Sequence, residues 1–193
     1  MYRLLLGKVS VLSAGFLPPA LIAEAPSGPR RPRWLAGRAL LARAVSPLPD
    51  IGYGEQGKPC FSSPSPLWFN LSHSGDDIAL LLSDEGEVGC DIEALRPRAR
   101  WPALAEALFS PGERAQIAAA PPAAQLPTFW QIWTRKEAML KQRGGSVWQM
   151  AQADSTQPDS LFIAHHWLNT LSIAVCTPTP VNLAALITSA TVR

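Results

Sequence analysis

Two acidic residues spaced two positions apart, Asp91 and Glu93, are the part of this sequence best suited to chemistry. They end an apolar stretch typical of a β-strand, in which alternate side chains share a face, so both carboxylates should point the same way. Two carboxylates about 4 Å apart repel each other by roughly 4 kcal/mol at an effective dielectric constant near 20. A partly buried pair therefore needs a cation, and oxygen ligands favour a hard ion such as Mg²⁺. The alternative is a pair of hydrated acids at an exposed strand edge.

A third acid can join this pair from the longest predicted helix, residues 128–143, which ends at a pair of glycines. Trp133, Glu137 and Lys141 are four residues apart in succession, so they share one face of that helix. An ordinary ion pair between Glu137 and Lys141 on the helix surface is the alternative. Lys136 lies about 100° further round the helix, on a mostly apolar face. A lysine there calls for an anionic partner or an extended aliphatic stem.

Donors suited to phosphate groups lie in other segments of the chain. Ser72 and His73 occur where a predicted strand gives way to a polar loop, and Lys58 lies in a segment rich in proline, glycine and serine. Each has an ordinary alternative, a polar turn for the first two and a surface lysine for the third. A Ser–His hydrolase is less suitable, because adjacent strand residues point to opposite faces and the sequence has no Gly-X-Ser-X-Gly elbow.

Glu113 stands at the third position of a predicted helix that follows Ser110 and has Pro111 at its first position. This is the pattern of a capping box, in which the serine and glutamate side chains bind free N–H groups at the helix start. Capping accounts for Glu113 without any catalytic role, so its membership of a functional site stays open.

The elements that must position these residues are strands and helices in both halves of the chain. Their periodicities predict strands at 3–12, 67–72, 78–82, 87–93, 161–163 and 171–176, and helices at 33–46, 101–108 and 128–143. We expect residues 87–93 to pair back on 78–82 as a hairpin. The turn between them marks the predicted boundary of two subdomains, 1–86 and 87–193. This order of elements favours an α+β fold with mainly antiparallel sheets.

The composition is that of a soluble globular protein, with 193 residues, 47% apolar and 17% charged. No apolar run approaches the roughly 18 residues of a membrane span. Lys8 interrupts the first apolar segment too early for a signal peptide, so a first strand explains it better. The cysteines, three in number, form neither a disulfide framework nor a zinc pattern, which favours a reducing cytoplasm. They are Cys60, Cys90 and Cys176.

Positive charge is concentrated in the segment 28–43, which contains no acid. This segment should attract phosphate or an acidic partner. Its arginines are Arg30, Arg31, Arg33, Arg38 and Arg43.

The motifs combine into a recognisable succession. In chain order the sequence has Gly-Lys-Pro at 57–59, Asn-Leu-Ser-His-Ser at 70–74, Val-Gly-Cys-Asp-Ile-Glu at 88–93, Phe109 four residues before Glu113, and Trp-Thr-Arg-Lys-Glu-Ala at 133–138 with Lys141. This succession resembles the Sfp-type 4′-phosphopantetheinyl transferases, and most closely the AcpT-type holo-acyl-carrier-protein synthases. The resemblance is dense over residues 57–141 and less sharp at both ends of the chain.

The resemblance implies transfer of 4′-phosphopantetheine from coenzyme A to a serine hydroxyl of an apo acyl carrier protein, releasing adenosine 3′,5′-bisphosphate. It implies a pseudo-dimer of two similar α+β halves, with coenzyme A contacts from residues 1–86 and metal and catalytic residues from 87–193. The expected metal is Mg²⁺, with Mn²⁺ as a substitute. We expect a cytoplasmic monomer that acts on neither nucleic acid nor membranes.

The resemblance also implies roles for single residues, assigned by their positions in the motifs. Asp91, Glu93 and Glu137 would be the metal ligands. Lys141 would contact the pyrophosphate and offset charge on the leaving group, and Glu137, directly or through a water molecule, would be the base. The residues expected to contact coenzyme A are Arg33, Lys58, Ser72, His73, Lys136 and Lys141. Glu113 matches an acidic position whose role is less settled.

Two other functions stay open at this point. One is a metal-dependent nuclease, although such sites usually have a lysine two residues after the second acid, where this chain has Leu95. The other is a non-catalytic module that binds coenzyme A or a carrier protein. The arginines at 96, 98 and 100 are a candidate docking surface for an acidic carrier protein.

Overall fold

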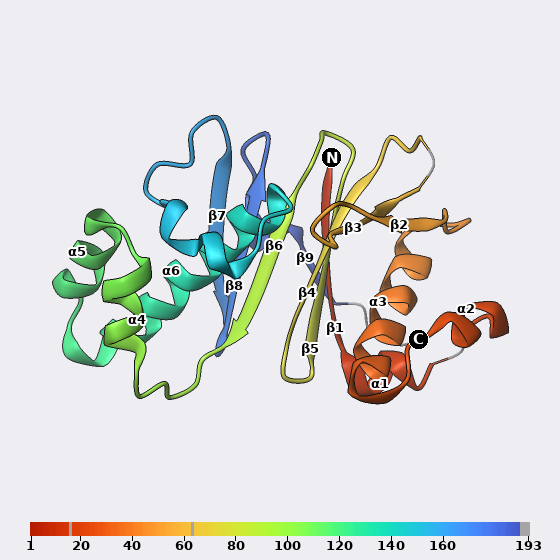
Figure 1. The fold of residues 1–193 in the computed structure, drawn as a ribbon, viewed down its shortest axis with the longest axis horizontal. Coiled ribbons are helices and arrows are strands. Elements are labelled where there is room, and N and C mark those ends of the chain that lie inside the picture. Colours follow the sequence, from red (N-terminus) through yellow and green to blue (C-terminus); the bar gives the residue numbers. More distant parts are fainter. Residues whose placement is uncertain (16, 63, 190–193) are drawn as a thin grey trace.

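The computed structural model describes residues 1–15, 17–62 and 64–189, and two sheets stand side by side in it between two groups of helices (Figure 1). The predicted α+β class with mainly antiparallel sheets is confirmed. Helices α4 (Trp101–Leu108), α5 (Pro111–Ala119) and α6 (Pro122–Gln142) lie on one side, and α1 (Val9–Ser13), α2 (Pro19–Glu24) and α3 (Arg31–Ala44) on the other.

The first sheet has four strands in the order β4-β5-β1-β9. They are β1 (Tyr2–Lys8), β4 (Trp68–Ser74), β5 (Asp77–Ser83) and β9 (Ile187–Ser189). Helix α3 packs on this sheet through apolar residues such as Leu40 and Leu41, which are fully buried. A 3₁₀ turn, η1 (Gly28–Arg30), precedes α3, and the short hairpin of β2 (Ile51–Tyr53) and β3 (Pro59–Phe61) lies between α3 and β4.

The first predicted strand, 3–12, was too long, because the chain turns into helix α1 at Val9. Val9 and Leu12 are both buried in the first core. Residues three apart lie on one face of a helix but on opposite faces of a strand, so only the helix buries both. Helix α2 and the 3₁₀ turn η1 follow α1 along the chain before α3 begins.

The second sheet has three antiparallel strands in the order β6-β8-β7. They are β6 (Gly89–Ala94), β7 (Phe162–Leu168) and β8 (Leu171–Thr177). Helix α6 lies across β6 and β8, and its buried aromatic residues Phe129 and Trp130 form the centre of the second core. The remaining elements are the 3₁₀ segment η2 (Val147–Gln152) and the short helix α7 (Leu183–Leu186).

The predicted hairpin between residues 78–82 and 87–93 is wrong. Strand β5 pairs with β4 and β1, whereas β6 pairs with β8 in the other sheet. The turn that follows β5 therefore carries the chain from one sheet to the next. A hairpin and a crossing between sheets use the same kind of turn residues, so the local pattern does not separate them.

Side chains of β4 join the two sheets in place of a backbone ladder. Asn70, Ser72 and Ser74 alternate along β4 and so share one face, and all three are buried. Each accepts a hydrogen bond from a backbone N–H of β6. The contacts are Asn70 Oδ1 with Cys90 N at 2.8 Å, Ser72 Oγ with Ile92 N at 3.2 Å, and Ser74 Oγ with Ala94 N at 3.1 Å. This seam places the acids of β6 against β4.

The subdomain boundary after residue 86 stays a prediction. It falls between β5 and β6, where the chain leaves the first sheet. Strand β9, however, returns from the C-terminal part of the chain to pair with β1. Within the described residues, no helix is long and apolar enough to cross a membrane.

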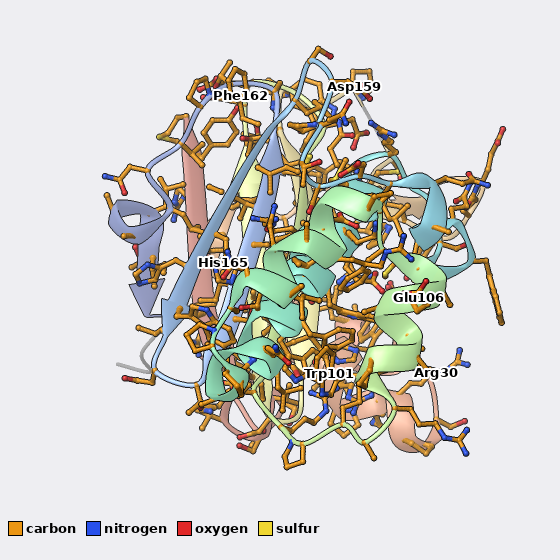
Figure 2. The ribbon with its side chains drawn as sticks, turned by 90° about the vertical axis from the view of Figure 1, so that its left-hand side faces the viewer. Arg30, Trp101, Glu106, Asp159, Phe162 and His165 are labelled. Carbon is orange, nitrogen blue, oxygen red and sulfur yellow. The ribbon has the colours of Figure 1, made fainter. Side chains whose placement is uncertain are left out.

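His165 adds a pH-dependent contribution to the stability of the second half. Figure 2 labels it on β7, and its Nε2 lies 2.9 Å from Ser172 Oγ, which in turn lies 2.8 Å from Thr134 Oγ1 on α6. Burial, together with the charges of Arg135 and His166, lowers the pKa of His165 from 6.5 to about 4. The unfolded chain therefore binds more protons than the folded chain between those two pH values. Stability is complete above the unfolded pKa and is lost as the pH falls toward 4.

We expect the wild-type protein to lose about 1–2 kcal/mol more stability than His165→Gln between pH 7 and pH 4.5, a value reduced for partial exposure of the ring. Urea unfolding of both proteins at several pH values measures the difference. Parallel pH profiles for the two proteins would contradict this role of His165.

Candidate active site

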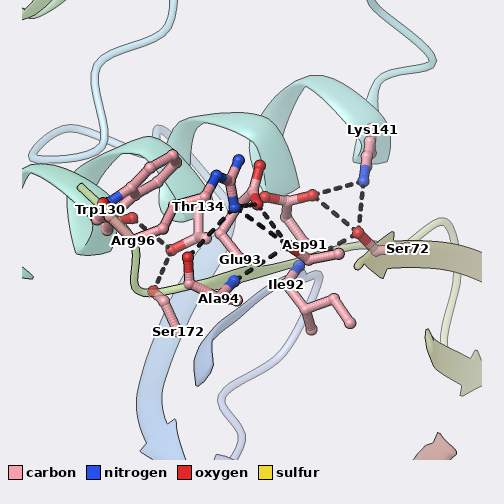
Figure 3. A network of polar contacts seen from close by, with 11 residues as sticks. Ser72, Asp91, Ile92, Glu93, Ala94, Arg96, Trp130, Thr134, Lys141 and Ser172 are labelled. Atoms are coloured by element: carbon pink, nitrogen blue, oxygen red, sulfur yellow. Dashed lines mark hydrogen bonds and ion pairs between the residues drawn. The ribbon is translucent and has the colours of Figure 1, made fainter. Parts of the chain in front are cut away.

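Asp91 lies at the centre of a polar network that three elements build together (Figure 3). It projects from β6 and is 5% exposed. Its Oδ1 accepts hydrogen bonds from Lys141 Nζ on α6 at 2.6 Å and from Ser72 Oγ on β4 at 2.9 Å. Lys141 Nζ is also 2.9 Å from Ser72 Oγ, so the three groups form a closed triangle.

The other oxygen of Asp91, Oδ2, is buried without a hydrogen-bond partner in the described part of the chain. Burial raises the pKa of the Asp91 carboxyl, and the Lys141 ammonium and the Ser72 hydroxyl oppose that rise. A buried carboxylate oxygen without a partner is costly unless a cation or donor reaches it. Asp91 therefore keeps one buried oxygen that no described protein group binds.

Glu93 lies two residues further along β6 and has its own partners. Its Oε2 accepts from Ser74 Oγ at 2.7 Å and from Arg96 Nη1 at 2.8 Å. The Glu93 side chain is 19% exposed, so this carboxylate is nearer to solvent than Asp91. The sequence pattern missed Ser74 as a member of this site. Its position two residues after Ser72, on the same face of β4, is the signal that identifies it.

Glu137 approaches the two acids of β6 from α6. Burial and the nearby charges of Asp91 and Glu93 raise the pKa of Glu137 to about 7. No described side chain or backbone group donates a hydrogen bond to its carboxylate. The structure thus brings all three predicted acids together, from two different elements.

These acids do not form a finished metal cage. Among the described residues, no group of three His, Cys, Asp or Glu side chains is arranged to hold a metal ion. Asp91 and Glu93 are instead paired with cations of the protein, Lys141 and Arg96. The donor set is nevertheless one of hard oxygen ligands with an unpartnered buried atom, which suits a divalent cation such as Mg²⁺.

A cationic pocket of about 380 Å³ adjoins this network between α3, β3 and β4. Its lining includes Arg30 from η1, Arg33 and Trp34 from α3, and Ser72 and His73 from β4. Burial, Arg33 and Lys141 lower the pKa of His73, so the imidazole is held neutral beside two cations. The structure thus places three of the residues predicted to contact a nucleotide in one cavity.

Lys58 lies at a second opening, beside the end of α6. Its Nζ donates to the carbonyl oxygens of Val88 at 3.1 Å and Gln142 at 2.9 Å and pairs with the Glu87 carboxylate. Lys58 and Lys141 line the same pocket of about 190 Å³. The two lysines therefore line one cavity, although they come from distant parts of the sequence.

Lys136 and Glu113 lie apart from this network. Their side chains are both 0% exposed and form an ion pair of 2.6 Å. Glu113 also completes the predicted capping box with Ser110, which is confirmed. Glu113 is thus the anionic partner expected for Lys136, a lysine on the apolar face of α6. A fully buried ammonium that is bound to protein partners cannot contact coenzyme A, so we leave Lys136 out of the proposed site.

Comparison with known proteins identifies the family of this chain. Residues 87–178 match the family described as the 4′-phosphopantetheinyl transferase superfamily. The chain is 66% identical over 185 residues to the 4′-phosphopantetheinyl transferase AcpT of Escherichia coli strain K12, covering 96% of this chain and 95% of the relative. The AcpT of Salmonella typhimurium is 66% identical over 183 residues, with 95% of each chain covered.

A more distant relative matches about half of the chain. The 4′-phosphopantetheinyl transferase of Bacillus subtilis is 36% identical over 95 residues, which cover 49% of this chain and 41% of the relative. The match to AcpT at both ends of the chain extends the similarity beyond the acids of β6 and α6. The chain therefore belongs to the 4′-phosphopantetheinyl transferase superfamily and is a transferase of its AcpT type.

Proposed function

We propose that this protein transfers 4′-phosphopantetheine from coenzyme A to a serine hydroxyl of an apo acyl carrier protein in a Mg²⁺-dependent reaction. The observation that carries the proposal is the buried Oδ2 of Asp91, which has no hydrogen-bond partner among the described residues. The charge of Asp91 acts on Glu137, and Ser72, which binds the other oxygen of Asp91, lines the cationic pocket. Such a cluster needs a cation, and the pocket beside it needs anions. Coenzyme A with a divalent metal supplies both.

Coenzyme A would lie with its nucleotide phosphates in the pocket of Arg33 and His73. Its pyrophosphate would then reach Lys141, which already lies within hydrogen-bond distance of Ser72. Lys58, which lines the same neighbouring cavity as Lys141, adds a further cation. Guanidinium and ammonium groups bind phosphate oxygens through short, charge-assisted hydrogen bonds.

Asp91, Glu93 and Glu137 would hold the metal, Mg²⁺ or in its place Mn²⁺. When bound, the ion neutralises the acids and polarises the phosphoryl group. The fit rests on the oxygen of Asp91 that has no partner among the described residues and on the position of Glu137. Burial, together with the charges of Asp91 and Glu93, raises the pKa of Glu137 and makes a compensating cation favourable there.

Side chains of the protein would accept the proton of the attacking serine and stabilise the charge on the leaving group. The serine Oγ of the carrier protein attacks the phosphorus that bears pantetheine, and the bond to the bridging oxygen breaks, so that adenosine 3′,5′-bisphosphate leaves. The Glu137 carboxylate takes the serine proton, directly or through a water molecule. The Lys141 ammonium stabilises the charge that develops on the leaving bisphosphate.

The test is an incubation of the protein with an apo acyl carrier protein, coenzyme A and Mg²⁺, followed by mass spectrometry of the carrier. We expect a mass gain equal to one phosphopantetheine group, and no gain when the metal is chelated. Absence of a gain with several different carrier proteins would sink the proposal.

We further propose that residues 1–86 supply most coenzyme A contacts and residues 87–193 supply the metal and catalytic groups. A monomer suffices for this arrangement, because every proposed group comes from one chain. The free cysteines suit a reducing cytoplasm.

The carrier protein would dock on the basic loop after β6, with Arg98 as its anchor. The Arg98 guanidinium lies 4.7 Å from the ring centre of Trp133 and 5.4 Å from that of Trp130. These rings hold the charge in place beside the acids. Arg100 is exposed at the start of α4. Arg96 differs from both, because it is bound to Glu93.

We expect the double change Arg98→Gln and Arg100→Gln to raise the KM for the carrier about fivefold, since charges at the edge of an interface govern encounter. The KM for coenzyme A should change less than about twofold. Steady-state kinetics with each substrate varied in turn measures the split, and Arg3→Gln on β1 is the matched charge control. Equal changes in both KM values would refute this docking site.

A further inference from the structure

Each acid of β6 has a cation of its own. Asp91 pairs with Lys141 at 2.6 Å, and Glu93 pairs with Arg96 at 2.8 Å. Glu137 has neither an ion pair nor a hydrogen bond within the described residues. If all three acids are ionised, the two cations leave one negative charge uncompensated. Cations of the protein itself thus offset two of the three negative charges in this cluster of acids.

The two cations are held differently. Lys141 is 28% exposed and faces the cavity that would hold the pyrophosphate, so it can stay in the site when the substrate binds. Arg96 is 48% exposed and lies at the solvent side of Glu93. A divalent metal that binds beside Glu93 would therefore repel the Arg96 guanidinium toward solvent.

Arg96 has other contacts that would remain if it left Glu93. Its guanidinium carbon lies 4.5 Å from the ring centre of Trp130, and its backbone oxygen accepts from Trp130 Nε1 at 3.0 Å. Its Nη1 also lies 3.2 Å from the carbonyl oxygen of Ala94. The side chain can thus give up its ion pair without losing its place, and an ion pair this exposed is weak.

We propose that Arg96 is a counter-cation that the divalent metal displaces from Glu93. It is a positioning residue: it neutralises Glu93 and holds its Oε2 before the metal binds, and it competes with the metal for that oxygen. This inference rests on the proposed function, because the metal it concerns is the one that the transferase reaction would use. By this competition, Arg96 would raise the metal concentration that is needed to fill the site.

A Mn²⁺ titration followed by electron paramagnetic resonance, with coenzyme A present, tests this exchange. Removal of the competing charge in Arg96→Gln should lower the Mn²⁺ dissociation constant about three- to tenfold at low salt, with a smaller gain at high salt. Arg96→Lys keeps the charge and should stay close to wild type. The matched control is Arg114→Gln, which removes the similarly exposed Arg114–Glu106 pair on α5 and α4 and should change nothing.

Turnover gives a second readout. In Arg96→Gln, the Mn²⁺ concentration for half-maximal rate should fall by the same factor, and kcat at saturating metal should change less than about twofold. Should Arg96→Gln not fold, Arg96→Met keeps an aliphatic stem against Trp130 and is expected to give the same gain.

An unchanged or higher Mn²⁺ dissociation constant in the neutral variants would overturn the proposal, as would equal gains in Arg96→Lys and Arg96→Gln. The titration needs no carrier protein. A wild-type protein that modifies no carrier would therefore refute the transferase reaction while leaving the result for Arg96 standing.

Discussion

Asp91→Asn is expected to reduce phosphopantetheine transfer at least about 100-fold, since it removes a charge that both the metal and Lys141 require. The amide is nearly isosteric with the carboxylate and keeps an acceptor for Ser72 and Lys141, which now hydrogen-bond Oδ1. Lys141 is partly exposed, so water can solvate its charge. The folded state should therefore survive, at a cost of no more than about 2 kcal/mol. Mass spectrometry of the carrier and urea unfolding measure the two effects.

The matched control for this change is Asp77→Asn. Asp77 also pairs with a lysine, Lys8, at 2.6 Å, but on the surface of the first sheet. Loss of this exposed pair should leave transfer unchanged and stability within about 1 kcal/mol of wild type. Full activity in folded Asp91→Asn would remove Asp91 from the site and with it the metal proposal.

Gly89→Ala should be the most destabilising single change in the site region, with a loss of at least about 3 kcal/mol. Gly89 begins β6 where α6 crosses it. A methyl group at this position would overlap the backbone of Ala138 and Gln142. Backbone atoms cannot rotate away as side chains do, so α6 would have to separate from β6. That movement would also carry Glu137 away from Asp91.

Denaturant unfolding measures this loss, and Gly54→Ala is the control. A methyl group at Gly54 would meet only the carbonyl oxygen of Lys58 at 3.7 Å, an ordinary contact. We expect its stability to stay within about 0.5 kcal/mol of wild type. A Gly89→Ala protein as stable as wild type would show that β6 and α6 do not pack as closely as described.

Features with a local origin follow from the sequence. Asp91 and Glu93 share a face because strand side chains alternate, and Glu137 and Lys141 share a stripe because four residues make about one helical turn. The capping box of Ser110 and Glu113 is likewise a matter of neighbouring residues and is confirmed. The sequence also indicated the turn after β5, but not which sheet the next strand joins.

The partners of these residues depended on the tertiary structure. Only the fold decided that β6 pairs with β8, that Lys136 meets Glu113 rather than a substrate, and that Arg96 binds Glu93. Such contacts join elements whose separation along the chain leaves no periodic signal, and several arrangements satisfy the same local pattern. The sequence by itself thus determined which side chains could act and which way they face on their own element. The packing of α6 and β4 against β6 decided which of them meet.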